Sequence, residues 1–156
     1  MRNLAILLFL FGILSVNLSL GQDVDDILIW GERDLEWTDF SGPIDQESHH
    51  EASTRSQLRT PTSWNSDSIT GIITAEFIKS KSWVKGTPSD LLLKHEQLHF
   101  DITKYHARMF RKTVANHRFK SYENMTQEVT ELFNERFQMY EAMQNLYDQD
   151  VVLQLK

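Results

Sequence analysis

The sequence contains no cysteine, and this absence excludes several classes of protein. Without thiols the chain cannot form a disulfide scaffold, an iron–sulfur site, a thiolate zinc site or a cysteine nucleophile. Only three prolines and six glycines occur among 156 residues, which excludes a collagen-like or low-complexity chain. Basic residues are also scarce, with 16 Lys and Arg against 22 Asp and Glu and a net charge of −6. Because nucleic-acid binders usually carry a basic face, we expect no nucleic-acid partner.

What is present indicates one folded domain behind an export signal. Hydrophobic residues make up 40% of the chain, which suits a small packed core. Arg2 precedes an apolar run over residues 4–14, and the small residues Ser19 and Gly21 follow it. This order is typical of a cleavable signal peptide, and the run is shorter than the ~20 residues of a spanning helix. We therefore predict a signal peptide over 1–21 and a secreted or periplasmic domain over 22–156, without a membrane anchor after cleavage.

The first half of this domain has the pattern of strands and turns. Residues 27–83 contain alternating stretches at 35–40, 52–58 and 69–77, of which the last is the clearest. Turn residues occur at 41–44 and again at 85–88, where the pattern ends. We expect a small antiparallel or mixed β-sheet in this half.

The second half has the period of two helices. Ser89 can cap a helix that nothing breaks before about Asn116, and a second helix fits Ser121 to about Tyr147. The predicted inward stripe of the first helix is Leu92, His95, His99, Ile102, His106 and Met109, and that of the second is Met125, Val129, Leu132, Met139, Met143 and Leu146. The sequence thus predicts an α+β fold in which the sheet packs against an antiparallel two-helix hairpin.

The motif that carries chemistry is His95-Glu96-Gln97-Leu98-His99. Two His at positions i and i+4 of a helix project from one face, so both imidazoles can bind one Zn²⁺. Glu96 lies beside the first ligand, where it can take a proton from a zinc-bound water and pass it to the leaving amine. These residues predict a zinc-dependent hydrolase with His95 and His99 as ligands and Glu96 as general base.

The motif does not supply a third ligand. If the hairpin turns near residue 118, position 99 lies level with about 137, and Glu135 is the nearest acid. Glu135 is therefore the first choice, and the alternatives left open are His106, Glu128 and Asp150. His106 lies about 10 Å along the helix from His99, which is too far for the same ion unless the helix bends.

Several stretches resemble the family called domain of unknown function 922, which is regarded as a family of secreted zinc-dependent proteases. They are Leu35–Gly42, Ala52–Thr54, Ser82–Val84, Leu92–Thr103, Ala107–Arg108 and Met143–Asp148. The resemblance implies a zincin-like fold, zinc ligation by His95 and His99, and an acid/base role for Glu96. The family's closing segment continues with an acid–Thr pair and a His, but this chain has Val151 and Leu153 at the Thr and His places.

We expect an exported zinc metallohydrolase, a peptidase whose peptide or protein substrate adds along a sheet edge. The departure at the C-terminus keeps a second hypothesis open, a catalytically inactive, protein-binding module with a vestigial or structural zinc site. A third is a zinc amidase that acts on cell-wall peptides. Among the other polar residues, we interpret His49-His50-Glu51 as surface and Asp101 as a surface acid or a residue that orients a ligand. Tyr105, Tyr140 and Tyr147 could stabilise an oxyanion, although such residues usually belong to the core.

Overall fold

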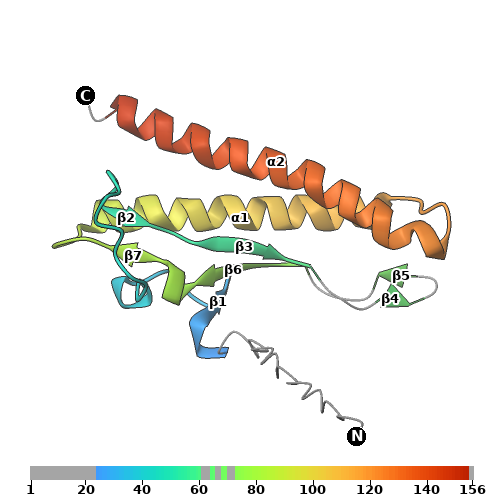
Figure 1. Ribbon diagram of the computed structural model, residues 1–156, viewed down its shortest axis with the longest axis horizontal. Coiled ribbons are helices and arrows are strands. Elements are labelled where there is room, and N and C mark those ends of the chain that lie inside the picture. Colours follow the sequence, from blue (N-terminus) through green and yellow to red (C-terminus); the bar gives the residue numbers. More distant parts are fainter. Residues whose placement is uncertain (1–23, 61–63, 66–67, 70–72, 155–156) are drawn as a thin grey trace, which may run out of the picture.

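The computed structural model describes residues 24–60, 64–65, 68–69 and 73–154. The predicted signal peptide, residues 1–21, lies outside these residues. Figure 1 shows two layers, a small sheet on one side and a long helical hairpin on the other. The elements in chain order are the 3-10 helix Val24–Asp26, β1 Ile27–Ile29, the 3-10 helix Trp37–Asp39, β2 Ala52–Ser53, β3 Ser56–Arg59, β4 Trp64–Asn65, β5 Ser68–Ile69, β6 Thr74–Ile78, the 3-10 helix Lys79–Lys81, β7 Trp83–Val84, α1 Asp90–Asn116 and α2 Tyr122–Gln154.

The sheet is antiparallel, with the order β1-β6-β3, and two further antiparallel pairs join β2 to β7 and β4 to β5. The single strand predicted over 52–58 is divided into β2 and β3, with Thr54 and Arg55 between them. The strand predicted over 69–77 is also wrong at its start, because Ile69 pairs within β4 and β5 while β6 begins at Thr74. The predicted α+β class, with a small antiparallel sheet and two helices, is confirmed.

The core lies between the sheet and α1. Phe100, Ala107 and Phe110 of α1 are completely buried, and Phe77 of β6 packs between Phe40 and Phe100 at ring-centroid distances of 5.2 and 5.8 Å. Burial of such side chains supplies most of the driving force for folding. The face of α1 that packs on the sheet therefore lies beside the predicted inward stripe. The part of that stripe that contains His95 and His99 faces α2 instead.

Helix α2 crosses α1 obliquely, and only its first half follows the predicted apolar stripe. Met125 and Val129 are buried, but Met139, Met143 and Leu146 are 46, 38 and 59% exposed. Among the described helices, none has the combination of length and apolar character that crossing a bilayer requires.

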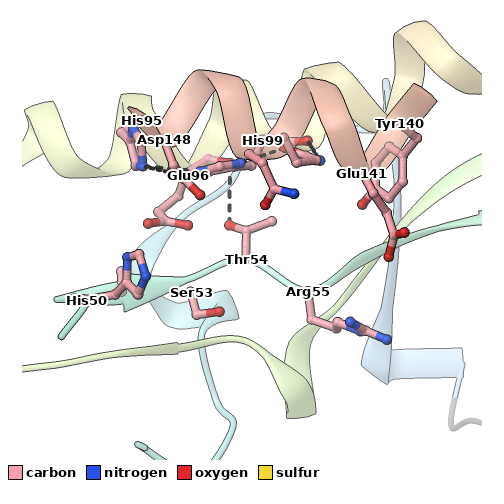
Figure 2. A pocket seen from close by; sticks show the side chains of 13 residues that line it. His50, Ser53, Thr54, Arg55, His95, Glu96, His99, Tyr140, Glu141 and Asp148 are labelled. Atoms are coloured by element: carbon pink, nitrogen blue, oxygen red, sulfur yellow. Dashed lines mark hydrogen bonds and ion pairs between the residues drawn. The ribbon is translucent and has the colours of Figure 1, made fainter. Parts of the chain in front are cut away.

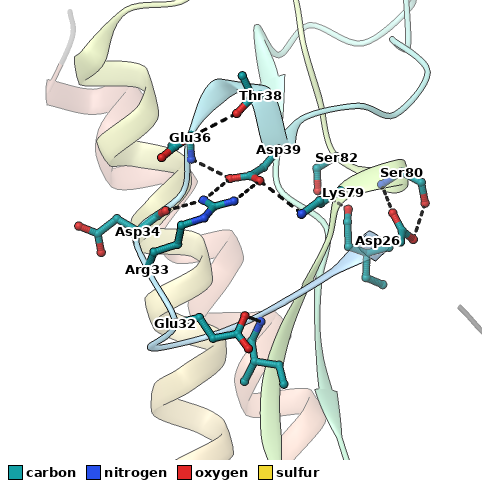
Figure 3. A network of polar contacts seen from close by, with 12 residues as sticks. Asp26, Glu32, Arg33, Asp34, Glu36, Thr38, Asp39, Lys79, Ser80 and Ser82 are labelled. Carbon is teal, nitrogen blue, oxygen red and sulfur yellow. Dashed lines mark hydrogen bonds and ion pairs between the residues drawn. The ribbon is translucent and has the colours of Figure 1, made fainter. Parts of the chain in front are cut away.

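A charged cluster holds the segment before β2 against the end of β6 (Figure 3). Arg33 donates two hydrogen bonds to the carboxylate of buried Asp39, at 2.7 and 2.6 Å, and Lys79 Nζ lies 3.8 Å from the same carboxylate. Burial alone would raise the pKa of Asp39, but the hydrogen bonds from Arg33 and from the backbone N–H of Glu36 outweigh it and lower that pKa. The cluster therefore attaches the segment between β1 and β2 to the residue that follows β6, and the positive charges compensate the buried carboxylate of Asp39.

His106 is a buried polar residue whose replacement should stabilise the fold. Its ring is 2% exposed, and neither ring nitrogen has a hydrogen-bond partner in the described part of the chain. Burial, with a contribution from the charge of Arg136, lowers the pKa of His106, so the unfolded chain binds the proton more readily below about pH 6.5. His106→Leu should raise the free energy of unfolding by about 1–3 kcal/mol, with a larger gain at pH 5.5 than at pH 8, measured by urea denaturation. His49→Leu, at an exposed position, is the control, and a variant less stable than wild type would contradict the prediction.

Candidate metal centre

The N-terminal half of α1 presents the His-Glu motif to α2 and to the loop between β2 and β3. The helix begins where the sequence predicts, because the side chain of Ser89 accepts a hydrogen bond of 3.1 Å from the N–H of Leu92. His95 and His99 lie one turn apart, with their ring centroids separated by 4.7 Å (Figure 2). The local geometry predicted from the i and i+4 spacing is therefore observed.

Three ligand atoms meet at this point. His95 Nε2 and His99 Nε2 are 3.1 Å apart, and Asp148 Oδ1 of α2 lies 2.9 Å from His99 Nε2 and 3.4 Å from His95 Nε2. His95, His99 and Asp148 form a group that could hold a metal ion. Two imidazoles and one carboxylate are a usual set of protein ligands for a divalent transition metal.

The third member of this group is Asp148 and not Glu135, the first choice of the sequence analysis. Glu135 is on the exposed side of α2, and Glu128 is paired with His117 at 2.7 Å. His106 is buried outside the group, and the side chain of Asp150 is not among those described.

The register of the hairpin explains the wrong choice. The sequence analysis placed His99 level with residue 137, but Gln144 is the residue that contacts His99. Helix α2 begins at Tyr122, one residue after the predicted start, so the helix bounds are close to those expected. The shift of seven residues, about two turns, arises instead from how α2 packs along α1 after the turn. The resemblance had already singled out Met143–Asp148, and this segment was the signal that could have identified Asp148.

Hydrogen bonds from α2 orient both imidazoles. Gln144 Nε2 donates to the backbone carbonyl of His99 at 3.0 Å, which directs its amide oxygen toward His99 Nδ1 at 2.6 Å. Because that oxygen can only accept, the proton of the neutral His99 ring is on Nδ1 and the lone pair of Nε2 faces Asp148. His95 Nδ1 is hydrogen-bonded to the hydroxyl of Tyr147 at 3.1 Å, and the two rings are stacked.

The Nε2 atoms of His95 and His99 and the Oδ1 atom of Asp148 lie close together. Burial, together with the charge of His99, lowers the pKa of His95 despite the opposing effect of Asp148. These three atoms lie within hydrogen-bond distance of one another, and a metal cation between them would be attracted by the lone pairs of all three. The electrostatics therefore favour a positively charged ligand at this point.

Glu96 lies beside the three ligand atoms and is nearly completely buried. Its Oε2 has no hydrogen-bond partner in the described part of the chain. Burial is the main cause that raises the pKa of Glu96, and the charge of Asp148 adds to it, while contacts with Thr54 and the charge of His99 lower it. A buried carboxylate with a free oxygen is an effective acceptor for a proton.

The three ligand atoms and Glu96 line an open cavity of about 280 Å³. One wall comes from the chain around β2, and the opposite wall comes from α1 and α2 (Figure 2). The lining residues are His50, Ala52, Ser53, Thr54, Arg55, His95, Glu96, His99, Tyr140, Glu141, Gln144, Asn145 and Asp148. The division of the predicted strand at residues 54 and 55 therefore has a consequence, because it turns this segment toward the motif.

Gln97 of the motif and the nearby Asp101 have a structural role. Gln97 accepts a hydrogen bond of 2.8 Å from the N–H of Leu35 and donates one of 3.0 Å to Asp101. Asp101 also accepts a hydrogen bond of 2.7 Å from the indole N–H of Trp30. These two residues attach the segment after β1 to α1, so Asp101 does not orient a metal ligand.

Comparison with known proteins finds a similar family over part of the chain. A family model described as "Bacterial protein of unknown function (DUF922)" matches residues 80–151. Over these residues the chain is similar to the DUF922 family. The matched segment contains His95, Glu96, His99 and Asp148, so the DUF922 match covers every residue of the candidate centre. No curated protein and no solved structure matches the chain.

Asp148→Asn should weaken metal binding far more than Glu135→Gln does. Each substitution removes one carboxylate from α2, but only Asp148 approaches both imidazoles. We expect Asp148→Asn to raise the Kd for Zn²⁺ by more than ~100-fold, and Glu135→Gln to leave it unchanged, in competition titrations with a chromophoric chelator. Equal affinities in the two variants would exclude Asp148 as a ligand.

Gln144→Leu should weaken metal binding by a smaller factor. The variant removes the acceptor that fixes the tautomer of His99, an outer contact whose loss usually costs 10–100-fold, and we expect a Kd for Zn²⁺ raised by about that factor. Gln144→Glu keeps an acceptor and should retain most of the affinity, and Gln138→Leu on the exposed side of α2 is the control. If Gln144→Leu and Gln138→Leu behave alike, Gln144 does not orient the ring.

Proposed function

We propose that this protein is an exported zinc-dependent metallohydrolase that cleaves peptide bonds, with Glu96 as general base. The observation that carries the proposal is the convergence of His95, His99 and Asp148 beside the free oxygen of Glu96 at an open cavity. The signal-like N-terminus supports export.

The donor set fits zinc. Two neutral imidazoles and one carboxylate provide the three protein ligands that a catalytic zinc site uses, and they leave one position for water or substrate. The hydrogen bonds of Gln144 and Tyr147 to the outer ring nitrogens resemble the contacts that orient metal-binding His in general. The unpartnered oxygen of Glu96 is also consistent with a water molecule beside the ion.

The chain's own residues would move the proton. When bound, zinc would polarise the substrate carbonyl and make a water molecule more acidic. Glu96 would accept a proton from the attacking water as the new C–O bond forms, and would deliver it to the amine nitrogen as the C–N bond breaks. Burial raises the pKa of Glu96, which brings its proton affinity closer to the value that both transfers need.

The sheet supports a peptide as the substrate. β3 is an edge strand of the three-stranded sheet, and the chain just before it forms a wall of the cavity. An extended peptide could therefore align with residues 53–55 and pass the ligand atoms. An amidase that acts on cell-wall peptides would use the same residues, so assays should include both linear peptides and peptidoglycan fragments.

A catalytically inactive, protein-binding module remains the second candidate. It is favoured by Val151 and Leu153, which take the places where the family pattern has Thr and His. Asp148 weakens this argument, because it offers a third donor without that His.

Glu96→Gln should separate catalysis from metal binding. The amide has nearly the shape of the carboxylate but cannot accept the proton, so we expect hydrolysis of a quenched peptide pool to fall ~10²–10⁴-fold while zinc content stays at wild-type level. Glu135→Gln, on the exposed side of α2, is the control for the loss of one negative charge. Hydrolysis that persists in Glu96→Gln would remove Glu96 from the mechanism. A zinc-loaded wild type that hydrolyses neither peptides nor peptidoglycan fragments would favour the binding module.

A further inference from the structure

His50 is exposed, as its sequence context predicts, and it also lies on the cavity wall opposite the motif. It lines the cavity together with His95, Glu96 and Asp148, and Figure 2 shows its ring on the strand side at the same end of the cavity. His50 is not one of the three residues that could hold the metal.

The backbone around His50 is fixed on both sides. The N–H of His50 donates a hydrogen bond of 3.1 Å to the side chain of Ser48. Lys85 Nζ donates to the carbonyl of Ser48 at 2.6 Å, and the N–H of Lys85 donates to the carbonyl of Glu51 at 2.7 Å. The antiparallel pair of β2 and β7 continues this attachment from Ala52 onward. The ring is therefore carried by a chain that β7 holds in place.

The two tyrosine hydroxyls near the motif are already engaged. The hydroxyl of Tyr147 is hydrogen-bonded to His95, and the hydroxyl of Tyr140 donates to the carbonyl of Ser56 at 3.4 Å. No ring nitrogen of His50 forms a hydrogen bond or ion pair with the rest of the described chain, so its N–H remains free to donate. Opposite it stand the acceptors Glu96 and Asp148, which cannot stabilise negative charge on a substrate.

We propose that the imidazole of His50 donates a hydrogen bond to the carbonyl oxygen of the substrate as negative charge develops on that oxygen. This inference rests on the proposed function. A donor at this place would stabilise the transition state more than the ground state, so it would act on kcat more than on KM. The residue completes the cavity from the strand side, while the helices supply the ligands and the base.

The test compares His50→Ala and His50→Gln with the matched control His49→Ala, whose residue is exposed and does not line the cavity. We expect His50→Ala to retain the zinc affinity of wild type, to lower kcat on the peptide pool by ~10²-fold and to change KM little. His50→Gln keeps an N–H donor and should recover part of kcat, and His49→Ala should match wild type.

A second readout does not depend on turnover. Inorganic phosphate, a tetrahedral oxyanion, should bind zinc-loaded His50→Ala at least ~10-fold more weakly than zinc-loaded His49→Ala, measured by calorimetry. Loss of zinc affinity in His50→Ala would overturn the proposal by making His50 a ligand. Equal phosphate affinities in the two variants would also overturn it. If wild type hydrolyses nothing, the proposed function fails, and the phosphate comparison by itself supports or overturns the anion contact of His50.

Discussion

The convergence of three potential metal ligands from two helices is the constraint on which the candidate centre depends. The Nε2 atoms of His95 and His99 and one oxygen of Asp148 converge from two helices, and the outer nitrogen of each ring is hydrogen-bonded to α2. Gln144 directs the lone pair of His99 inward, so the geometry is suited to a cation at its centre. A helix hairpin selected for stability alone would place apolar residues at these contacts.

The second helix shows the consequence of this constraint. In its first half, Met125 and Val129 are buried against the core, as an amphipathic helix requires. In its second half, the polar residues Gln144 and Tyr147 face α1, and apolar side chains such as Leu146 are exposed. Departures of this kind from the hydrophobic pattern are expected at functional sites.

The His-Glu motif combines two tasks within a few turns of one helix. His95, Glu96 and His99 face the cavity, while Phe100 anchors the helix in the core. The neighbouring Gln97 and Asp101 hold the segment after β1. The proposed chemistry is thus supported on a rigid helix that the sheet, the core and an N-terminal segment hold together.

The sequence by itself determined what depends on contacts within one helix. The cap at Ser89, the extent of the first helix and the convergence of His95 and His99 all follow from the 3.6-residue period, which acts over a few neighbouring residues. The choice of Asp148 was decided only by the tertiary structure. It depends on how α2 packs along α1 after the turn, and the observed pairing of His99 with Gln144 is displaced by seven residues, about two turns, from the predicted one.

The place of His50 was decided in the same way. An alternating pattern shows which residues share a face of a strand, but not where the strand breaks or which wall the broken segment joins. The break after β2 and the contacts of Lys85 bring this ring to the cavity, and both result from packing between segments that are distant in the sequence. Local periodicity therefore specified the two imidazoles and the base, whereas only the three-dimensional packing brought the third ligand and the opposite wall to them.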